Sequence, residues 1–246
     1  MKKRMKLIIG LGLIVLLGVV TYWYYPKSPS AFLSDKELAL EINNTQSNMK
    51  VKQIQDKVAV DDKHFFVPFI TTNGDYGTSY WEWQRTKWKV LNIDNTGEPM
   101  IWKINKNDPS TYRLVWNLHK DDKVDHMKFY LNRERSFQVS NGIEYYYPKV
   151  QMEKKITITA ASYGSQKLPN EWISVVDSFV KIESSVKQSL FDDFDLDRHL
   201  YFAWMPYDKT GKEAIIEHSV NGYSFTVDDI ELDFVRWMNN HDLESQ

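Results

Sequence analysis

The spacing of apolar residues along the chain changes more than once, and each spacing predicts a different kind of element. Leu38 and Ile42 lie four residues apart, as on one side of a helix, and Ser34 precedes Glu37 by three positions. A serine followed three residues later by glutamate is the capping-box signature of a helix start. The pattern therefore predicts a short helix that begins after Ser34.

A period of two replaces this spacing from about residue 58 to about residue 160. Valine, isoleucine and aromatic residues alternate there with polar ones, which is typical of strands with one buried face. Between these runs lie clusters rich in glycine, asparagine and aspartate, residues that tolerate positive φ. The turn clusters lie at 73–77, 94–97, 140–142, 209–211 and 221–222. We expect an antiparallel β-meander folded as a sandwich or open barrel.

One hairpin can be laid out in register from this alternation. If its loop lies at residues 120–123, Trp116 faces Met127 and Leu114 faces Phe129 across the two strands. All four side chains then share one face, while the other face is largely polar. The pattern therefore predicts a pair of neighbouring strands with one buried side.

Helical spacing returns at Asn170, a residue type that caps helices well. Apolar residues then recur every three or four positions over roughly five turns, as on an amphipathic helix. This stripe consists of Trp172, Val175, Val176, Phe179, Ile182, Val186 and Leu190. The spacing predicts a long helix packed on the β-rich part.

The C-terminal segment contains strand-like runs at 199–205, 213–220 and 223–225, followed by a second helical pattern. Thr226 with Asp229 resembles a helix start. The inner face of this predicted last helix consists of Ile230, Phe234, Trp237 and Met238.

The predicted fold class is α+β, with an antiparallel β-rich body and two C-terminal helices behind an N-terminal transmembrane helix. Residues 1–25 form the basic tip and membrane anchor, and residues 26–34 form a linker. The β-rich meander with its short leading helix covers 35–162. Residues 163–246 form an α+β part that we expect to pack on the β body.

The N-terminal anchor is predicted from an uncharged run of 19 residues, positions 7–25, which follows Lys2, Lys3, Arg4 and Lys6. As a helix such a run spans roughly 28 Å, close to the ~30 Å hydrocarbon core of a bilayer. Four aromatic residues close it at the headgroup level, and the basic cluster places the N-terminus in the cytoplasm. We therefore expect a single-pass cell-membrane protein whose main domain lies outside.

A cleaved signal peptide is the alternative, because Ser28 and Ser30 form a small-x-small pair ahead of Ala31. The apolar run is longer than is usual for such a peptide, and bulky aromatics precede the site, which favours the retained anchor. Either way the folded part is exported. The chain has no cysteine, which excludes disulfides and thiolate metal sites and suits a bacterial envelope.

The charge of the exported part argues against nucleic acid as a partner. Every basic residue before position 26 belongs to the cytoplasmic tip, so the remainder carries a net charge of about −6. Nucleic-acid binding depends on cations that neutralise phosphates. The predicted partners are the membrane, through the N-terminal span, and a protein or a cell-wall polymer.

The cation-site candidate is the acidic stretch at 192–197, where Asp193, Asp195 and Asp197 alternate. Ca²⁺ prefers several carboxylate oxygens, so these three side chains are weak metal ligands by type and spacing. The EF-hand pattern fails, because its glycine and glutamate positions hold Arg198 and Trp204. A solvated loop is the competing interpretation. A second cluster, with His119 and His126 on the predicted hairpin, reads better as a polar turn.

No cofactor is predicted, and the sequence carries none of the common catalytic motifs for acyl, phosphoryl or hydride transfer. Two carboxylates of a glycan hydrolase leave no sequence signature, because their separation is a spatial property.

Three tryptophans, Trp81, Trp83 and Trp88, fall within eight positions, interleaved with Arg85 and lysines. A three-residue loop at 95–97 would pair the strands on either side of it and turn Trp88 and Trp102 inward. Trp81 and Trp83 have the opposite parity from Trp88, so on one unbroken strand they face outward, and only a bulge within 84–87 turns them in. Trp81, Trp83 and Arg85 are therefore the candidate binding residues, with burial in the core as the alternative.

Together these features predict a non-enzymatic, membrane-anchored envelope protein that binds a protein partner or a cell-wall polymer. Two alternatives stay open: a glycan hydrolase with a carboxylate pair, and a structural or assembly factor.

Overall fold

The computed structural model describes residues 10, 12–18, 28–140, 142–158, 161–186 and 200–240. Within these ranges it is β-rich with mostly antiparallel sheets, as predicted. No helix in them is long and apolar enough to span a bilayer. Most of the predicted span at 7–25 lies outside the described residues.

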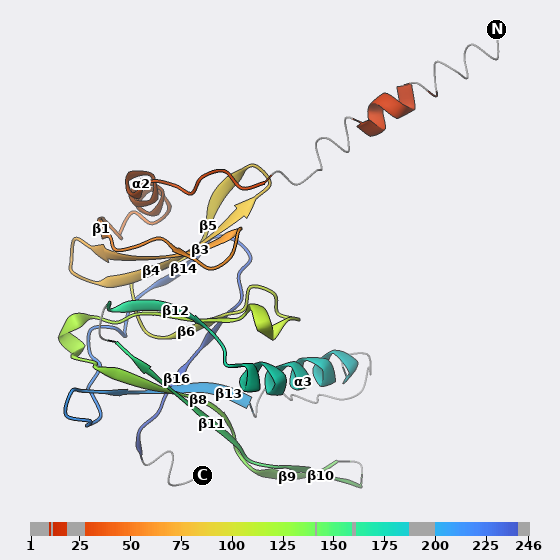
Figure 1. Ribbon diagram of the computed structural model, residues 1–246, viewed down its shortest axis with the longest axis vertical. Coiled ribbons are helices and arrows are strands. Elements are labelled where there is room, and N and C mark those ends of the chain that lie inside the picture. The colour runs from red at the N-terminus through yellow and green to blue at the C-terminus, as the bar shows by residue number, and fades with distance from the viewer. Residues whose placement is uncertain are drawn as a thin grey trace.

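Three sheets are stacked in layers, and a helix covers the outer face of the first of them (Figure 1). Sheet A consists of β1 (Val51–Ile54), β2 (Val58–Ala59), β3 (His64–Thr71), β4 (Tyr76–Gln84), β5 (Lys87–Asp94) and β14 (Ser224–Thr226). Sheet B consists of β12 (Tyr163–Lys167), β7 (Arg113–Asn117), β6 (Met100–Trp102) and β15 (Leu232–Phe234). Sheet C consists of β11 (Val150–Thr157), β8 (His126–Arg133), β13 (Leu200–Tyr207) and β16 (Arg236–Trp237).

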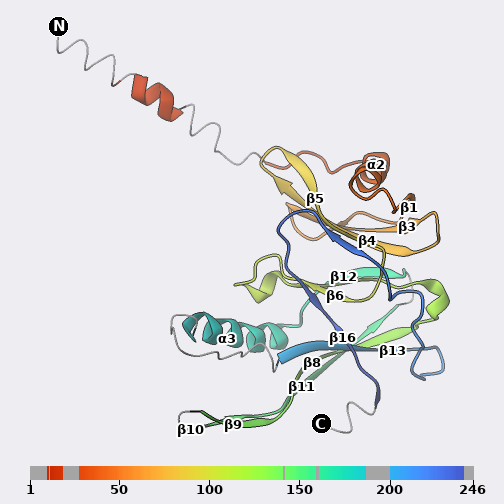
Figure 2. The ribbon, with the colours of Figure 1, turned by 180° about the vertical axis from the view of Figure 1, so that it is seen from behind.

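Further elements lie around the stack. Helix α2 (Asp35–Thr45) covers sheet A, and helix α3 (Asn170–Val186) lies beside sheets B and C (Figure 2). Two short 3-10 turns occupy Pro109–Thr111 and Lys120–Asp122. Strands β9 (Ser136–Ser140) and β10 (Ile143–Tyr147) form a two-stranded arm that projects away from the body.

The alternation of side chains along each strand builds the layers. On β8, Met127, Phe129 and Leu131 point into the core between sheets B and C, whereas Tyr130 points to the other face of sheet C. Sheet B has apolar neighbours on both faces, because Leu114 joins the core shared with sheet C and Val115 joins the core shared with sheet A. A strand buried on both faces reads as a nearly continuous apolar run.

Helix α2 begins as predicted. Ser34 and Glu37 form the reciprocal capping box, in which the Ser34 N–H donates to Glu37 Oε2 at 2.8 Å. Leu38 and Ile42 are fully buried against sheet A. The predicted long helix from Asn170 is also confirmed as α3, over the residues that the structure describes.

The predicted hairpin around residues 120–123 is wrong. Strand β7 pairs with β6 and β12, whereas β8 pairs with β11 and β13 in another sheet. The apolar face is nevertheless shared, because Trp116 and Phe129 meet across the two layers with ring centroids 6.4 Å apart. Alternation determines which side of a strand is buried and leaves open whether the partner lies beside it or above it.

The predicted pairing across the loop at 95–97 is also wrong, since β5 pairs with β4 and β14 while β6 pairs with β7 and β15. The chain crosses here from sheet A to sheet B. Trp88 and Trp102 are both buried as expected, but in different cores, since Trp88 packs with Phe32 and Phe65 above sheet A.

The predicted last helix is wrong as well. Its residues form β15 and β16, whereas the strand predicted just before it, at 223–225, is confirmed as β14. Each of these three strands lies at the edge of a different sheet. The backbone groups find partners there, as when the Lys103 N–H donates to Glu231 O at 2.9 Å and the Met238 N–H to Trp204 O at 3.0 Å. This segment forms hydrogen bonds to the edges of the sheets in place of the helix that its apolar spacing predicts. The segment after 163 therefore shares all three sheets with the segment before it.

Candidate functional site

The tryptophan-rich segment is a tight hairpin. Strands β4 and β5 are joined at Arg85, whose φ is 58°, and Trp83 lies directly opposite Trp88. The strand is therefore interrupted by a chain reversal within 84–87, where only a bulge had been considered. A register shift does occur, but between Tyr80 and Trp81.

The structure places both tryptophan candidates in the core, which corrects their assignment as a contact surface. Trp81 is 0% exposed and Trp83 is 7% exposed. The Trp81 indole N–H donates to Ser79 Oγ at 2.9 Å, so its polar atom is also satisfied inside the protein. The reversal at Arg85 brings these rings to the side of Trp88. Arg85 itself is exposed at the turn.

The exposed aromatic side chains lie elsewhere. Large rings that are at least 40% exposed occur on the β9–β10 arm and along the C-terminal strands. They are Phe137, Tyr146, Tyr223, Phe225, Phe234 and Trp237. Phe234 and Trp237 had been assigned to the inner face of a helix, so the wrong secondary structure concealed their exposure.

The metal candidates Asp193, Asp195 and Asp197 lie outside the described residues. Within the part of the chain that the structure describes, no group of three or more histidine and carboxylate side chains is placed to hold a metal ion. The two histidines of the second cluster are not brought together. His126 stacks on Tyr207 at 5.0 Å, whereas His119 lies 4.9 Å from His218.

His119 lines a cleft of about 580 Å³ that is bounded by residues 118–120, 123–124, 158, 161–162 and 208–210. Its floor is apolar, and its rim carries ammonium and imidazole groups. Leu118, Val124 and Ile158 form the floor, and His119, Lys120, Lys123 and Lys209 lie on the rim.

A second hollow of about 460 Å³ adjoins the first and shares His119 and Lys120 with it. It adds Lys52 and His218, with Tyr76 packed against His119 at 4.5 Å between ring centroids. We call the two hollows together the basic track. Asp208 lines the first hollow, and Asp75 and Asp121 line the second, so the excess of positive charge is greatest around Lys120, Lys123 and Lys209.

The lysines of the first hollow are available to a ligand. Among the described residues, Lys120, Lys123 and Lys209 form no ion pair within 4.0 Å. Lys123 also has a φ of 54°, a left-handed conformation that costs a non-glycine residue roughly 1 kcal/mol. Strain of this kind is often found at functional positions.

The hydroxyl groups of the first hollow are engaged in structural hydrogen bonds. Ser162 Oγ donates to Asn117 Oδ1 at 3.2 Å, and Thr210 Oγ1 donates to Asp208 Oδ1 at 2.7 Å. The imidazole of His119 accepts the Asp121 N–H through Nδ1. A nucleophilic hydroxyl needs an adjacent base. Among the described residues that line the first hollow, no hydroxyl is hydrogen-bonded to the His119 side chain.

Sequence reasoning missed this site because its parts come from segments far apart in the chain. The one available signal was the polar turn at 119–126, which was interpreted as a hairpin tip. Comparisons of the chain with protein-family models, with curated proteins and with solved structures find no match.

A smaller hollow of about 270 Å³ lies beside Trp102 and contains His64, Glu82, Asp229 and Glu231. The two ring nitrogens of His64 lie near different carboxylates: Nδ1 is 2.8 Å from Asp61 Oδ1, and Nε2 is 3.6 Å from Glu82 Oε1. Burial by itself would lower the pKa of His64, but the interactions with Glu82 and Asp61 outweigh it and raise the pKa. Conversely, the interaction with His64 lowers the pKa of Glu82.

The interaction between His64 and Glu82 makes the free energy of unfolding depend on pH. Folding raises the pKa of His64, so protonated His64 stabilises the folded protein. This stabilisation is fully present below the unfolded pKa of ~6.5 and is lost as the pH rises through the folded pKa. Glu82→Gln is therefore expected to destabilise the protein by about 0.5–1 kcal/mol at pH 5.5 and by less at pH 8.5. Urea unfolding at both pH values measures the difference.

Glu153→Gln is the matched control, because Glu153 pairs at 3.2 Å with a lysine, Lys128, and not with a histidine. Its effect should be the same at pH 5.5 and pH 8.5. An equal cost of Glu82→Gln at the two pH values would contradict the role of His64.

Proposed function

We propose that this chain is a non-enzymatic binding protein of a bacterial cell envelope, held by an N-terminal span, whose basic track binds an anionic cell-wall polymer. The observation that carries this proposal is the basic track itself. Two adjoining hollows share His119 and Lys120 and are lined by four lysines, the other three being Lys52, Lys123 and Lys209.

The chemistry of the track suits repeated phosphate or carboxylate groups. Lysine ammonium groups bind phosphate as compact point charges with three donors. Several anionic groups on one chain engage several lysines at once, so individually weak contacts add up through effective concentration. The exported part carries a net negative charge, so the local excess of positive charge at the track directs an anionic polymer to this part of the surface.

The position of the track supports the same function. The loops that build it lie on the side of the molecule opposite to the point where the N-terminal segment joins sheet A (Figure 1, Figure 2). An N-terminal membrane attachment would therefore leave the lysines of the track uncovered and open to a wall polymer.

A glycan hydrolase is the second candidate function. It is favoured by the smaller hollow, which places Glu82, Asp229 and Glu231 beside Trp102. Glycosidases need two carboxylates separated by roughly 5–9.5 Å. The volume of about 270 Å³ is small for a glycan chain of several sugar rings, since ligand pockets usually have ~300–1,000 Å³, and this favours the basic track as the main site.

Neutralising the three lysines of the first hollow is expected to weaken polymer binding. The triple variant Lys120→Gln, Lys123→Gln, Lys209→Gln should lose about 100-fold in affinity for a poly(glycerol phosphate) chain at low salt. The reason is that each ammonium near an anionic surface contributes about 1 kcal/mol. The loss is measured by sedimentation of the full-length protein with the immobilised polymer.

The control variant Lys36→Gln, Lys63→Gln, Lys87→Gln removes the same charge from exposed lysines outside the track and should bind nearly as wild type. Equal binding by both triple variants would overturn the proposal. If full-length protein instead cleaved a wall glycan and Glu82→Gln or Glu231→Gln abolished the cleavage, the hydrolase would replace it.

A further inference from the structure

A separate apolar pocket of about 260 Å³ opens between the edges of sheets B and C. Strand β12 is the edge strand of sheet B and β11 is the edge strand of sheet C. The interior of the protein is therefore accessible between them, at the N-terminal end of α3. None of the residues of this pocket belongs to the basic track.

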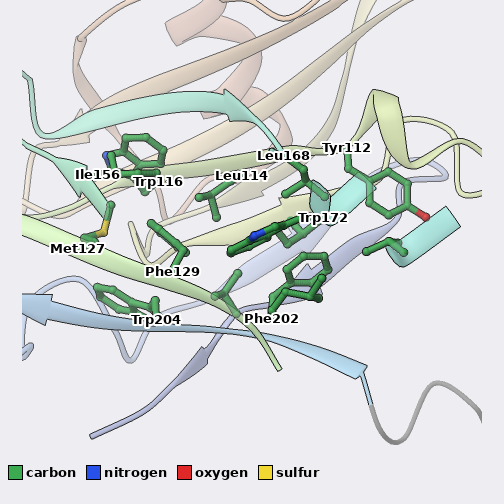
Figure 3. Close-up of a cluster of buried hydrophobic side chains, with 14 of the residues drawn as sticks. Tyr112, Leu114, Trp116, Met127, Phe129, Ile156, Leu168, Trp172, Phe202 and Trp204 are labelled. Carbon is green, nitrogen blue, oxygen red and sulfur yellow. The ribbon is translucent and has the colours of Figure 1, made fainter. Parts of the chain in front are cut away.

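The walls of the pocket are core side chains from both sheets and α3. Figure 3 shows Leu114, Phe129, Ile156, Leu168 and Trp172 lying between the layers. Each of them is at most 6% exposed. Trp172 and Phe129 provide flat aromatic surface, and the others provide aliphatic surface, so the interior is suited to an alkyl chain or an aromatic ring.

Polar groups occupy positions at the mouth where apolar residues are expected. On β11, Lys154 lies between Met152 and Ile156 in the alternation, and both of these neighbours pack into the core. On β12, Gln166 is paired with Leu114, whose side chain is also in that core. Lys154 and Gln166 thus lie on the inward faces of the two facing edge strands.

A second cation completes the mouth. Lys167 follows Gln166 and also lines the pocket. Among the described residues neither Lys154 nor Lys167 has a carboxylate within 4.0 Å. Both lysines are exposed to solvent, so each contributes a modest, salt-dependent attraction to an anion at the pocket. Two lysines and one glutamine, Lys154, Lys167 and Gln166, are thus among the residues that line this pocket.

The geometry points to a binding site for a small amphipathic anion, whose alkyl or aryl body lies between Phe129 and Trp172 and whose carboxylate or phosphate lies at Lys154, Gln166 and Lys167. The volume fits this class, since a protein cavity of ~150 Å³ already holds benzene. The site is independent of the polymer-binding role, because it uses a different surface and different residues.

A structural explanation for Lys154 has to be separated from this one. Inward-pointing lysines on edge strands also protect sheets from edge-to-edge aggregation. Such protection requires neither Gln166 nor Lys167 at the mouth and predicts no ligand. The two explanations therefore differ in what is bound, and binding has to be measured directly.

The experiment is equilibrium dialysis of radiolabelled octanoate against full-length protein in neutral-lipid nanodiscs, with empty nanodiscs dialysed in parallel. Saturable one-to-one binding is expected, with octanol about tenfold weaker and acetate unable to compete. The double variant Lys154→Gln, Lys167→Gln should weaken octanoate binding about tenfold or more. Lys155→Gln is the control, because this exposed neighbour on β11 has the opposite parity.

Absence of saturable octanoate binding would overturn the inference. So would equal affinity for octanoate and octanol, or equal losses in the double variant and in Lys155→Gln. A double variant that aggregates but binds octanoate as wild type would assign Lys154 to edge protection. Because the polymer assay uses other lysines, its outcome and this one are distinguishable.

Discussion

Asp122→Ala is expected to destabilise the protein by about 3–5 kcal/mol, the largest effect of any single carboxylate that the structure describes. Asp122 is 4% exposed, and its carboxylate accepts four hydrogen bonds. Oδ1 accepts the N–H groups of Glu217 and His218 at 3.1 and 3.0 Å, and Oδ2 accepts the N–H and hydroxyl of Ser219. Alanine leaves the two buried donors of Ser219 without this acceptor, at ~1–3 kcal/mol each before relaxation, and also removes the acceptor of the part-buried N–H groups of Glu217 and His218.

Two further variants test this explanation by urea unfolding. Asp121→Ala removes the neighbouring carboxylate, whose side chain is 60% exposed, and should change stability by about 0.5 kcal/mol or less. Asp122→Asn keeps one carbonyl acceptor and should cost less than Asp122→Ala. A cost for Asp122→Ala no larger than that for Asp121→Ala would show that the four hydrogen bonds contribute little.

The effect of Asp122 extends to the basic track. Its carboxylate ties the 217–219 segment to the turn that carries Lys120 and Lys123, and Ser219 Oγ also accepts the His119 N–H at 2.7 Å. Loss of this connection should loosen the wall between the two hollows. Asp122→Asn, which should remain folded, also removes a negative charge beside these lysines and by charge alone would strengthen polymer binding, so weaker binding by this variant would measure the loosened wall.

Gly97→Ala is expected to destabilise the protein by at least about 3 kcal/mol. A Cβ at this position would lie 1.7 Å from Asn117 O, which is backbone and cannot move alone. Gly97 lies where the chain crosses from sheet A to sheet B, and Gly97 O accepts the Asn117 N–H at 2.9 Å. Relief of the clash has to separate these two segments, a cost beyond the 1–3 kcal/mol usual for overpacking.

Gly74→Ala is the matched control in the same unfolding measurement. Gly74 has a φ of +96° and nothing within 4 Å of the position of an added Cβ. Its cost is limited to backbone conformation, about 1–2 kcal/mol. If the two substitutions cost the same, the close approach between Gly97 and Asn117 would not be a determinant of the fold.

The elements that the sequence predicted best are those whose signals are local. The capping box at Ser34 and the apolar stripe from Asn170 depend on residues within a few turns, and both helices form. The burial of Trp116, Met127 and Phe129 was also predicted, because alternation reports which face of a strand is apolar. The sequence did not reveal which strands are neighbours.

The candidate binding residues show the same limit. Parity alone placed Trp81 and Trp83 opposite to Trp88, because a reversal at Arg85, a residue type not typical of positive φ, was not foreseen. The lysines of the basic track gave no local signal. Charge near a turn is ordinary, and only the fold brings residues 52, 118–124 and 209 to one side.

By itself, the sequence determined that the chain is β-rich, that two helices form and where they begin, and which strand faces are buried, since these depend on short-range periodicity and capping. The tertiary structure decided the pairing of strands, the replacement of the predicted last helix by two edge strands, and the positions of both proposed sites. The physical reason is that hydrogen-bond partners for strands are non-local, so neighbours in space are chosen by the competition among all available edges.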